Sequence, residues 1–291
     1  MNLRRNRPPL KTVIIGAALL IPGLFFLAIA AFYLVPDELI EGRIKEAAIK
    51  KAGITFSQKS FRKVFPLGLE LQAVEIAGNN GAQLLLLDRV RARVNPLSVL
   101  AGRLTAYIDG DAGDGGFTGY AIFRPSGAAL IAEAKGVDFR YLPLFARSGV
   151  SINGLLDARV SVSKIGAGCL EGSISINGYR IERSEVKIMN FPLPFDSIDR
   201  AGGDAELKGC KARINGLWIE GRGLSARLKG EITAIKTPLA ESPVELTLEI
   251  IPKGDLVKRE FMFSLISNYR QSANYYSIPV RGTIGAPVFV R

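Results

Sequence analysis

The acidic turn Asp109-Gly110-Asp111-Ala112-Gly113-Asp114 is the stretch of this chain closest to a metal-binding motif. Calcium loops of the EF-hand type place oxygen ligands at positions one, three and five, a glycine at position six and a glutamate at position twelve. Here position five is Gly113, position six is Asp114 and position twelve is Tyr120. The spacing therefore predicts a hairpin turn and no calcium site.

Catalytic chemistry is limited by the absence of histidine from the 291 residues. Histidine is the commonest general base and the commonest metal ligand, so its absence excludes Ser-His-Asp and Cys-His sites together. No nucleophile with a neighbouring base and no paired carboxylates stand out. We predict a protein that is not an enzyme, with no catalytic residue, no cofactor-binding residue and no metal ligand.

Two cysteines, Cys169 and Cys210, are the only redox-active pair. In an oxidising compartment they form one disulfide if the fold brings them together. Both lie in strand-like segments, where an unpaired buried thiol is the alternative. The sequence leaves the choice open.

Two surfaces are candidates for binding. Arg89, Arg91 and Arg93 share one face of a predicted strand, where guanidinium groups can bind a lipid headgroup or an acidic protein, or can simply be solvated. The stripe Leu156, Ala158, Val160 and Val162 is either core or an apolar groove for a guest. Near the C-terminus, Tyr269, Tyr275, Tyr276 and Arg270 predict either an interaction edge or half-buried strand residues.

The elements around these residues begin with a basic stub, residues 1–11, followed by an uncharged apolar run over residues 12–35. About 20 apolar residues cross a bilayer as a helix, so this run predicts one transmembrane span. A cleaved signal peptide is the alternative, but the apolar run continues past its best cleavage site, Ala28-Ile29-Ala30. The basic stub keeps the N-terminus in the cytoplasm, so the rest of the chain lies across the membrane.

Residues 36–53 predict a short amphipathic helix, because acidic residues begin it, lysines follow and apolar residues recur at helical spacing. From residue 54 to 291 the period changes to two. Leu156, Ala158, Val160 and Val162, for example, alternate with Asp157, Arg159, Ser161 and Ser163. Turn residues such as Ile152-Asn153-Gly154 separate the runs, which predicts antiparallel hairpins.

The predicted fold is therefore all-β: one curved, mostly antiparallel sheet with an apolar face and a polar face, preceded by the two helices. Residues 95–102 and 139–145 interrupt the alternation and predict short helical or loop connections. A polar, glycine-rich stretch at residues 196–203 predicts a soft boundary within the sheet. Removing the stub's four charges from the net charge of +11 leaves +7 for the remainder. This favours an anionic membrane or an acidic partner and is too dispersed for nucleic acid.

Several stretches carry a resemblance to a known family: Val90-Arg91-Ala92-Arg93-Val94-Asn95-Pro96-Leu97 before Leu100-Ala101-Gly102-Arg103, the hairpin from Gly113 to Gly119, Tyr141-Leu142-Pro143-Leu144, and Ile278-Pro279-Val280-Arg281-Gly282-Thr283. With the N-terminal anchor, they resemble protein N of the bacterial type II (general) secretion pathway, the GspN family, within the broader AsmA-like group of envelope proteins. The likeness covers nearly the whole chain.

The resemblance implies a single-pass protein of the bacterial inner membrane with a cytoplasmic N-terminus and a periplasmic β domain. Its implied role is that of an accessory, non-enzymatic component of type II secretion, with other secretion subunits as partners. Larger AsmA-like relatives are thought to carry phospholipid in apolar grooves. The alternative function is therefore lipid binding or lipid transfer along the apolar face of the sheet.

Overall fold

The computed structural model describes most of the chain beyond the N-terminal stub: residues 23, 26–27, 29–52, 54–78, 81, 83–142, 150–166, 168–188, 191–193, 198–236, 241–254, 257 and 260–290. Most of the described residues lie in β-strands, as the alternating pattern predicted. The strands are β1 (Ile54–Ser57), β2 (Ser60–Val64), β3 (Gly68–Gly78), β4 (Gln83–Asn95), β5 (Leu104–Ala112), β6 (Gly115–Arg124), β7 (Gly127–Asp138), β8 (Val150–Ile165), β9 (Leu170–Ile188), β10 (Phe191–Leu193), β11 (Ile198–Lys208), β12 (Lys211–Gly221), β13 (Leu224–Ile232), β14 (Pro243–Pro252), β15 (Arg270–Ser272), β16 (Tyr275–Thr283) and β17 (Ala286–Phe289).

These strands form one antiparallel sheet in which neighbours in sequence are mostly neighbours in space. From β3 to β9 each strand pairs with the next, β9 pairs with β11, and pairing continues through β12, β13 and β14 to β16. β1 and β2 both pair with β3 at one edge, and β15 and β17 pair with β16 at the other. Among the described strands no pairing joins the two edges, so the sheet is open.

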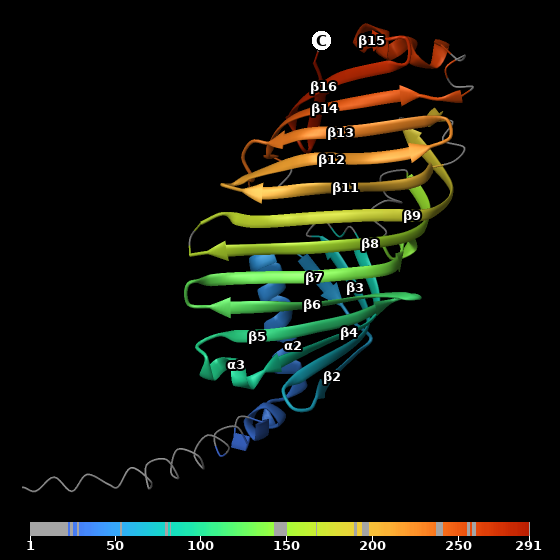
Figure 1. Cartoon of the computed structure of the whole chain (residues 1–291). Coiled ribbons are helices and arrows are strands. Elements are labelled where there is room, and N and C mark those ends of the chain that lie inside the picture. Colours follow the sequence, from blue (N-terminus) through green and yellow to red (C-terminus); the bar gives the residue numbers. More distant parts are fainter. Residues whose placement is uncertain are drawn as a thin grey trace, which may run out of the picture.

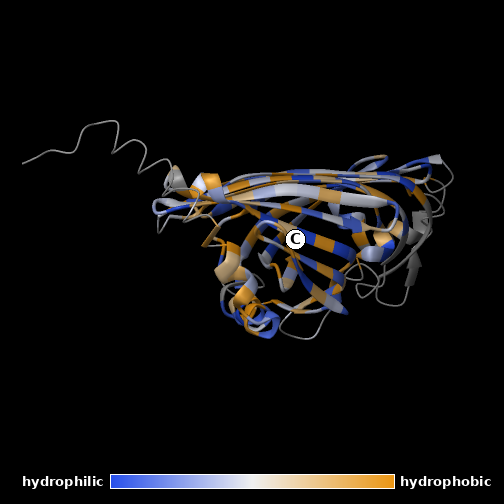
Figure 2. Ribbon diagram, turned by 90° about the horizontal axis from the view of Figure 1, so that it is seen from below, coloured by the Kyte–Doolittle hydropathy of each residue, from blue (hydrophilic) through white to orange (hydrophobic). Residues whose placement is uncertain are grey.

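The sheet is tall and strongly curved (Figure 1). Its first strands, β2 to β4, bend round behind β5 to β7, and in the view from below the whole sheet forms an arch (Figure 2). Twist in a sheet of this many strands accumulates in one direction, which gives such curvature without closure. The fold is thus the curved antiparallel sheet that the sequence predicted. The turn predicted at Ile152-Asn153-Gly154 is wrong, because these residues lie within β8, where the pairing with β9 shifts register.

The main core lies inside the curled end of the arch. Val74 of β3, Leu87 of β4, Ala112 of β5 and Val137 of β7 are buried together. Partly buried residues pack around them: Phe56, Leu71, Ile76, Leu85, Val90, Phe117, Ala134 and Tyr141. The face of the sheet that carries Val90, Phe117 and Ala134 is called the inner face below.

Short helices connect or flank the strands. They are α2 (Asp37–Ala47), a π-helical turn η1 (Ala48–Ala52), α3 (Pro96–Leu100), and the 3₁₀ helices η2 (Phe139–Tyr141) and η5 (Glu260–Tyr269). α3 occupies one of the predicted interruptions: Pro96 stands at its first position, and the Asn95 side chain accepts a hydrogen bond from the Leu97 N–H at 3.1 Å.

α2 begins after Pro36 with Asp37 and Glu38 in its first turn and Lys45 in its last, an arrangement that suits the helix dipole. Its contacts with the sheet are peripheral, since no residue of α2 is buried. Lys45 lies over the ring of Phe56 at 5.8 Å. The helix therefore leaves the inner face of the sheet largely uncovered.

The predicted transmembrane span, residues 12–35, lies mostly outside the described residues. Gly23, Phe26, Leu27 and Ile29 to Leu34 of this run are helical. Within the described part of the chain no helix has both the length and the apolar character needed to cross a membrane.

The stretch predicted as a soft boundary, residues 196–203, falls at the start of β11. Residues 196 and 197 lie outside the described part, while Ile198 to Gly203 belong to the strand. β11 pairs with β9 on one side and with β12 on the other, so the sheet is continuous here.

Candidate functional site: an uncovered apolar inner face

The inner face carries three apolar rows that run across the strands. Residues that pair directly across neighbouring antiparallel strands point to the same face, so the register identifies each row. Row 1 is Val90, Gly110, Phe117, Ala134, Ala158, Ile176, Gly203, Leu217, Leu228, Leu248 and Ile278.

Two further rows lie beside row 1 on the same face. Row 2 is Ala92, Ile108, Gly119, Ala132, Val160, Ile174, Ala205, Ile214, Gly230, Leu246 and Val280. Row 3 is Val94, Ala106, Ala121, Leu130, Val162, Gly172, Leu207, Ala212, Ile232 and Val244. None of the three rows contains a charged or polar side chain, so together they form one continuous apolar band.

Both ends of this band are covered. At the N-terminal end, row 1 runs into the core through Val90, Phe117 and Ala134. At the C-terminal end, Phe263 of η5 stacks on the ring of Tyr276 with 5.4 Å between the ring centroids. Val244, Ile278 and Val280 are buried there as well.

The described part of the chain leaves the middle of the band uncovered. Of the described side chains in rows 1 to 3 from β7 to β13, only that of Ala212 is buried. Leu130, Ile176 and Leu217 are 36–37% exposed, and the others are half-buried by their neighbours within the sheet. Soluble proteins rarely leave a large continuous apolar surface open, and such a surface usually marks a binding site.

Two glycines in the band let large side chains of neighbouring strands lie across them. A Cβ at Gly203 would lie 2.3 Å from the Leu217 side chain, because that side chain lies across the glycine of the neighbouring strand. The Phe117 ring lies over Gly110 in the same way, at 2.5 Å from the position of a Cβ. Leu217 and Phe117 therefore lie close against the sheet at these two glycines.

The uncovered part spans β7, β8, β9, β11, β12 and β13, which are six strands with five spacings between them. At about 4.8 Å per spacing, this gives roughly 24 Å. The hydrocarbon core of a bilayer, which holds two layers of acyl chains, is about 30 Å thick. The open band is therefore longer than the roughly 15 Å of one acyl layer.

The predicted stripe lies within this band. Ala158, Val160 and Val162 belong to rows 1, 2 and 3, and Leu156 pairs with the core residue Val137. The sequence predicted this stripe but not the residues beside it. Ile174, Ile214 and Leu217 lie in the same rows because of the register between the strands, which the sequence does not show. The sequence signal available for these residues was the alternation of apolar and polar side chains within each strand.

The outer face is polar and is crossed by ion pairs. One row runs from Glu70 through Arg91, Asp109, Thr118, Glu133 and Arg159 to Ser175. Arg159 pairs with Glu133 at 2.9 Å, and Arg213 pairs with Glu231 at 3.0 Å. Cross-strand pairs of this kind are expected on a solvated face.

The three predicted arginines belong to this outer face and are all engaged. Arg89 pairs with Asp111 at 2.8 Å, and Arg93 reaches Asp109 at 3.4 Å. Arg91 Nε donates to Glu70 at 2.9 Å. The hydrogen bond from Arg91 lowers the pKa of the Glu70 carboxyl, and a hydrogen bond from Arg62 lowers it further. These paired guanidinium groups match the solvated-face interpretation better than a free headgroup site.

The acidic turn is a hairpin between β5 and β6, as predicted. Asp109, Asp111, Asp114 and Glu133 line a hollow of about 310 Å³ with Lys135. Arginines pair with Asp109 and Asp111, and Arg159 and Lys135 pair with Glu133. No group of three or more His, Cys, Asp or Glu side chains in the described residues could hold a metal ion.

The C-terminal tyrosines are mostly packed into the sheet. Tyr276 is buried under η5, and the Tyr275 hydroxyl donates to Glu249 at 2.8 Å. This contact raises the pKa of Tyr275, while a hydrogen bond from Lys229 lowers the pKa of Glu249. Arg270 donates to the carbonyls of Ser272 and Ala273. The arrangement favours half-buried strand residues over an interaction edge.

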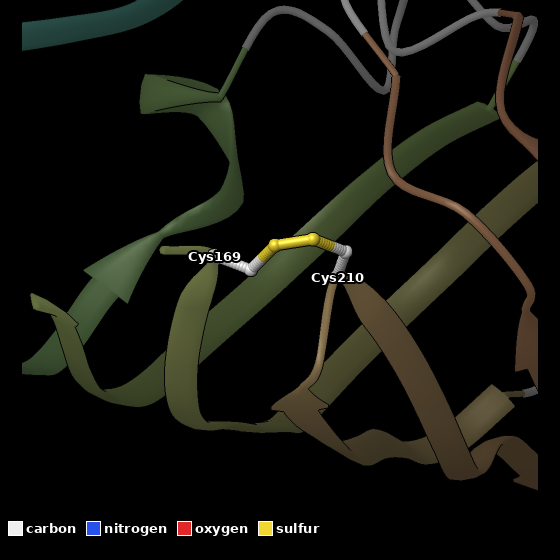
Figure 3. Close-up of a disulfide and its surroundings, with 2 residues drawn as sticks. All are labelled: Cys169 and Cys210. Carbon is white, nitrogen blue, oxygen red and sulfur yellow. A yellow bond between two sulfur atoms is a disulfide. The ribbon is translucent and has the colours of Figure 1, made fainter. Parts of the chain in front are cut away.

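Cys169 and Cys210 form a disulfide (Figure 3). Cys169 lies just before β9 and Cys210 just after β11, and these two strands pair, so their adjoining turns meet at one end of the sheet. The Cα atoms are 4.9 Å apart, within the usual range for a disulfide. The bond joins the β8–β9 hairpin to the β11–β12 hairpin.

No protein-family model matches the chain, and no curated protein and no solved structure matches it.

Proposed function

We propose that this protein binds the acyl chains of a phospholipid along the inner face of its sheet. The observation that carries the proposal is the open middle of the apolar band between two covered ends. A ligand of this face needs a long, flexible, wholly apolar part, because no polar side chain lies within rows 1 to 3. An acyl chain meets that requirement, and the roughly 24 Å of open band is long enough to hold it.

The location proposed from the resemblance is the periplasmic side of the bacterial inner membrane, with residues 12–35 as the anchor. The disulfide supports this placement, since disulfides persist in oxidising compartments such as the periplasm. The absence of histidine supports a binding role over an enzymatic one.

A part in type II secretion stays a prediction from the resemblance to the GspN family. A scaffold that binds no lipid should cover its apolar face with its own residues. The half-exposed residues of the open band therefore favour lipid binding over a scaffold role alone. A lipid-binding protein can still act beside secretion subunits, whose contacts would then lie on the polar outer face.

Photocrosslinking in cells tests the proposal, with one probe in place of Val160 and another in place of Arg159. These neighbours in β8 point to opposite faces: Val160 lies in row 2 of the band and Arg159 in the outer polar row. The proposal expects phospholipid adducts from position 160 and few from position 159. If position 160 gives no lipid adducts, or gives adducts with another protein instead, lipid binding on the inner face is wrong. Adducts between position 159 and secretion subunits would support the predicted partners.

A further inference from the structure

One long edge of the arch is formed by the turns at the left-hand ends of the strands in Figure 1. These turns follow β2, β4, β6, β8, β11, β13 and β16 in order along the sheet. We call this edge the turn rim. It includes the helix α3 and both cysteines of the disulfide, which holds two of its neighbouring turns together.

Large apolar side chains stand out from the turn rim. Phe65 in the β2–β3 turn is 70% exposed, Leu97 in α3 is 69% exposed and Ile165 at the end of β8 is 73% exposed. Other exposed apolar residues in or beside these turns are Val99, Leu104, Phe123, Leu170 and Ile284. These residues gather at the turns from β2 to β9, and Ile284 adds one at the β16–β17 turn at the far end of the rim.

Unpaired cations accompany them. Arg103, Arg124, Lys164, Lys208 and Lys211 lie in or next to the rim turns, are exposed, and form no ion pair with the described part of the chain. The cations of the outer face behave differently, because most of them pair with a carboxylate across the strands: Arg62, Arg89, Arg91, Arg93, Arg159, Arg200, Arg213 and Lys229. Acidic residues within two positions of the rim turns are fewer: Glu171, Glu231 and Glu241. Glu231 is already paired with Arg213.

The apolar N-terminal segment reaches the sheet at the same end. Lys63, near the end of β2 and two residues from Phe65, forms an ion pair with Asp37 at 2.8 Å. Its ammonium group also donates to the carbonyl of Val35 and lies 5.7 Å from the Phe32 ring. These contacts fix the start of the sheet to the end of the run predicted to enter the membrane.

We infer that the turn rim lies on the surface of an anionic phospholipid bilayer. Exposed aromatic and aliphatic side chains enter the boundary between headgroups and acyl chains, and Lys and Arg extend from the same turns to the phosphates. An acidic protein could match the charges, but the anchor at the same end of the strands favours a membrane as the occupant. In this orientation the strands stand upright on the bilayer and rows 1 to 3 run parallel to its surface. An acyl chain then enters the band from the side, between the turns.

Tryptophan quenching by brominated lipid tests the contact in the full chain. The native chain has one tryptophan, so Trp218→Phe provides a dark background. Ile165→Trp places a probe at the rim. Ile251→Trp places a matched probe near the opposite end of β14, where Ile251 is 42% exposed on the outer face. The variants are reconstituted in vesicles of phosphatidylethanolamine and phosphatidylglycerol with bromine on the acyl chains.

The inference expects tryptophan 165 to lose most of its fluorescence in brominated vesicles and tryptophan 251 to keep most of it. Equal quenching at both positions, or no quenching at 165, overturns it. Because both probes lie on the outer face, lipid held in the inner band does not produce this difference. The result is thus separable from the test of the proposed function. A photocrosslinking probe at position 165 repeats the measurement without the Trp218→Phe background.

The contribution of the rim cations to the membrane contact is tested separately. Lys208→Glu with Lys211→Glu should reduce quenching at position 165, and so should replacing phosphatidylglycerol with brominated phosphatidylcholine. Lys59→Glu with Arg222→Glu reverses two exposed charges away from the rim and should leave the quenching unchanged. If the two double variants behave alike, the rim does not recognise an anionic surface.

Discussion

Cys169 and Cys210 are covalently joined although 41 residues separate them, because β9 and β11 place the turns beside them at the same end of the sheet. The two hairpins held by this bond lie in the middle of the arch, where the residues that the structure describes form no second layer over the inner face. A crosslink there replaces part of the stability that a packed core would supply.

Loss of the disulfide should therefore be costly. For a loop of this length, the chain-entropy relation gives about 4 kcal/mol of stabilisation. We expect Cys169→Ser with Cys210→Ser to lower the free energy of unfolding by about that amount, measured by urea denaturation in detergent with Trp218 fluorescence. Reductant should destabilise the native chain and leave the double variant unaffected. Equal stability of the two proteins under oxidising conditions would contradict the prediction.

A charge in the open band should displace its ligand. Ile176 is in row 1 and 36% exposed, while its neighbour Ser175 lies in the polar row of the outer face. Ile176→Asp should strongly reduce the phospholipid that copurifies with the full chain, measured by mass spectrometry of extracted lipids, because an ionised carboxylate in contact with an acyl chain is costly. Ser175→Asp is the matched control and should retain the lipid. Equal lipid loss from both variants would mean that the lipid is bound elsewhere.

Glu70 links stability to pH. It is 1% exposed, and Arg91 Nε donates to it at 2.9 Å, with Arg62 on its other side. Its pKa is lowered from an ordinary value near 4.5, first by the Arg91 hydrogen bond. Because its pKa is lowered in the folded state, ionised Glu70 contributes its full stabilisation above about pH 4.5. This stabilisation is lost as the pH falls through the pKa of Glu70 in the folded protein.

Glu70→Gln should cost about 2 kcal/mol at neutral pH, the size expected for hydrogen bonds to a charged group. Urea unfolding at several pH values checks this: the difference between the native chain and the variant should shrink as the pH falls below 4.5. A difference that stays constant from neutral to acidic pH would assign the cost to packing.

Among the described side chains of η5, Phe263 covers the C-terminal end of the band by stacking on Tyr276. Phe263→Ala should destabilise the chain by about 2 kcal/mol, since Phe263 is only half-buried and a fully buried phenylalanine costs more. It should also increase the binding of an apolar fluorescent dye, because Tyr276 and Val280 become accessible. Val288→Ala, at a side chain that is 59% exposed in β17, serves as the control and should change stability by less than about 0.5 kcal/mol. Unchanged dye binding would mean that η5 does not cover the band.

Local patterns predicted several details correctly. The alternation of Val160 with Arg159 predicted a strand with two different faces, and the residues are found in an apolar row and a polar row. Asn95 and Pro96 predicted a break in the strands, where α3 forms. The missing ligands at Gly113, Asp114 and Tyr120 predicted a plain turn, and the chain makes a hairpin there.

Other features depended on partners that a local pattern does not identify. Arg89, Arg91 and Arg93 were open to several interpretations until the register placed Asp111, Glu70 and Asp109 against them. Cys169 and Cys210 could equally have been separate thiols until β9 and β11 paired.

The order of the amino acids was enough to predict most strands and the apolar face of each, because side chains alternate with a period of two along any extended chain. It also excluded catalysis by histidine. The folded sheet was needed to show that the apolar faces join into rows, that the sheet stays open, and that the described elements leave its middle uncovered. These features depend on the register between strands, on the accumulated twist of the sheet, and on η5 and the core lying at its two ends. All three are set by contacts between residues far apart in the chain.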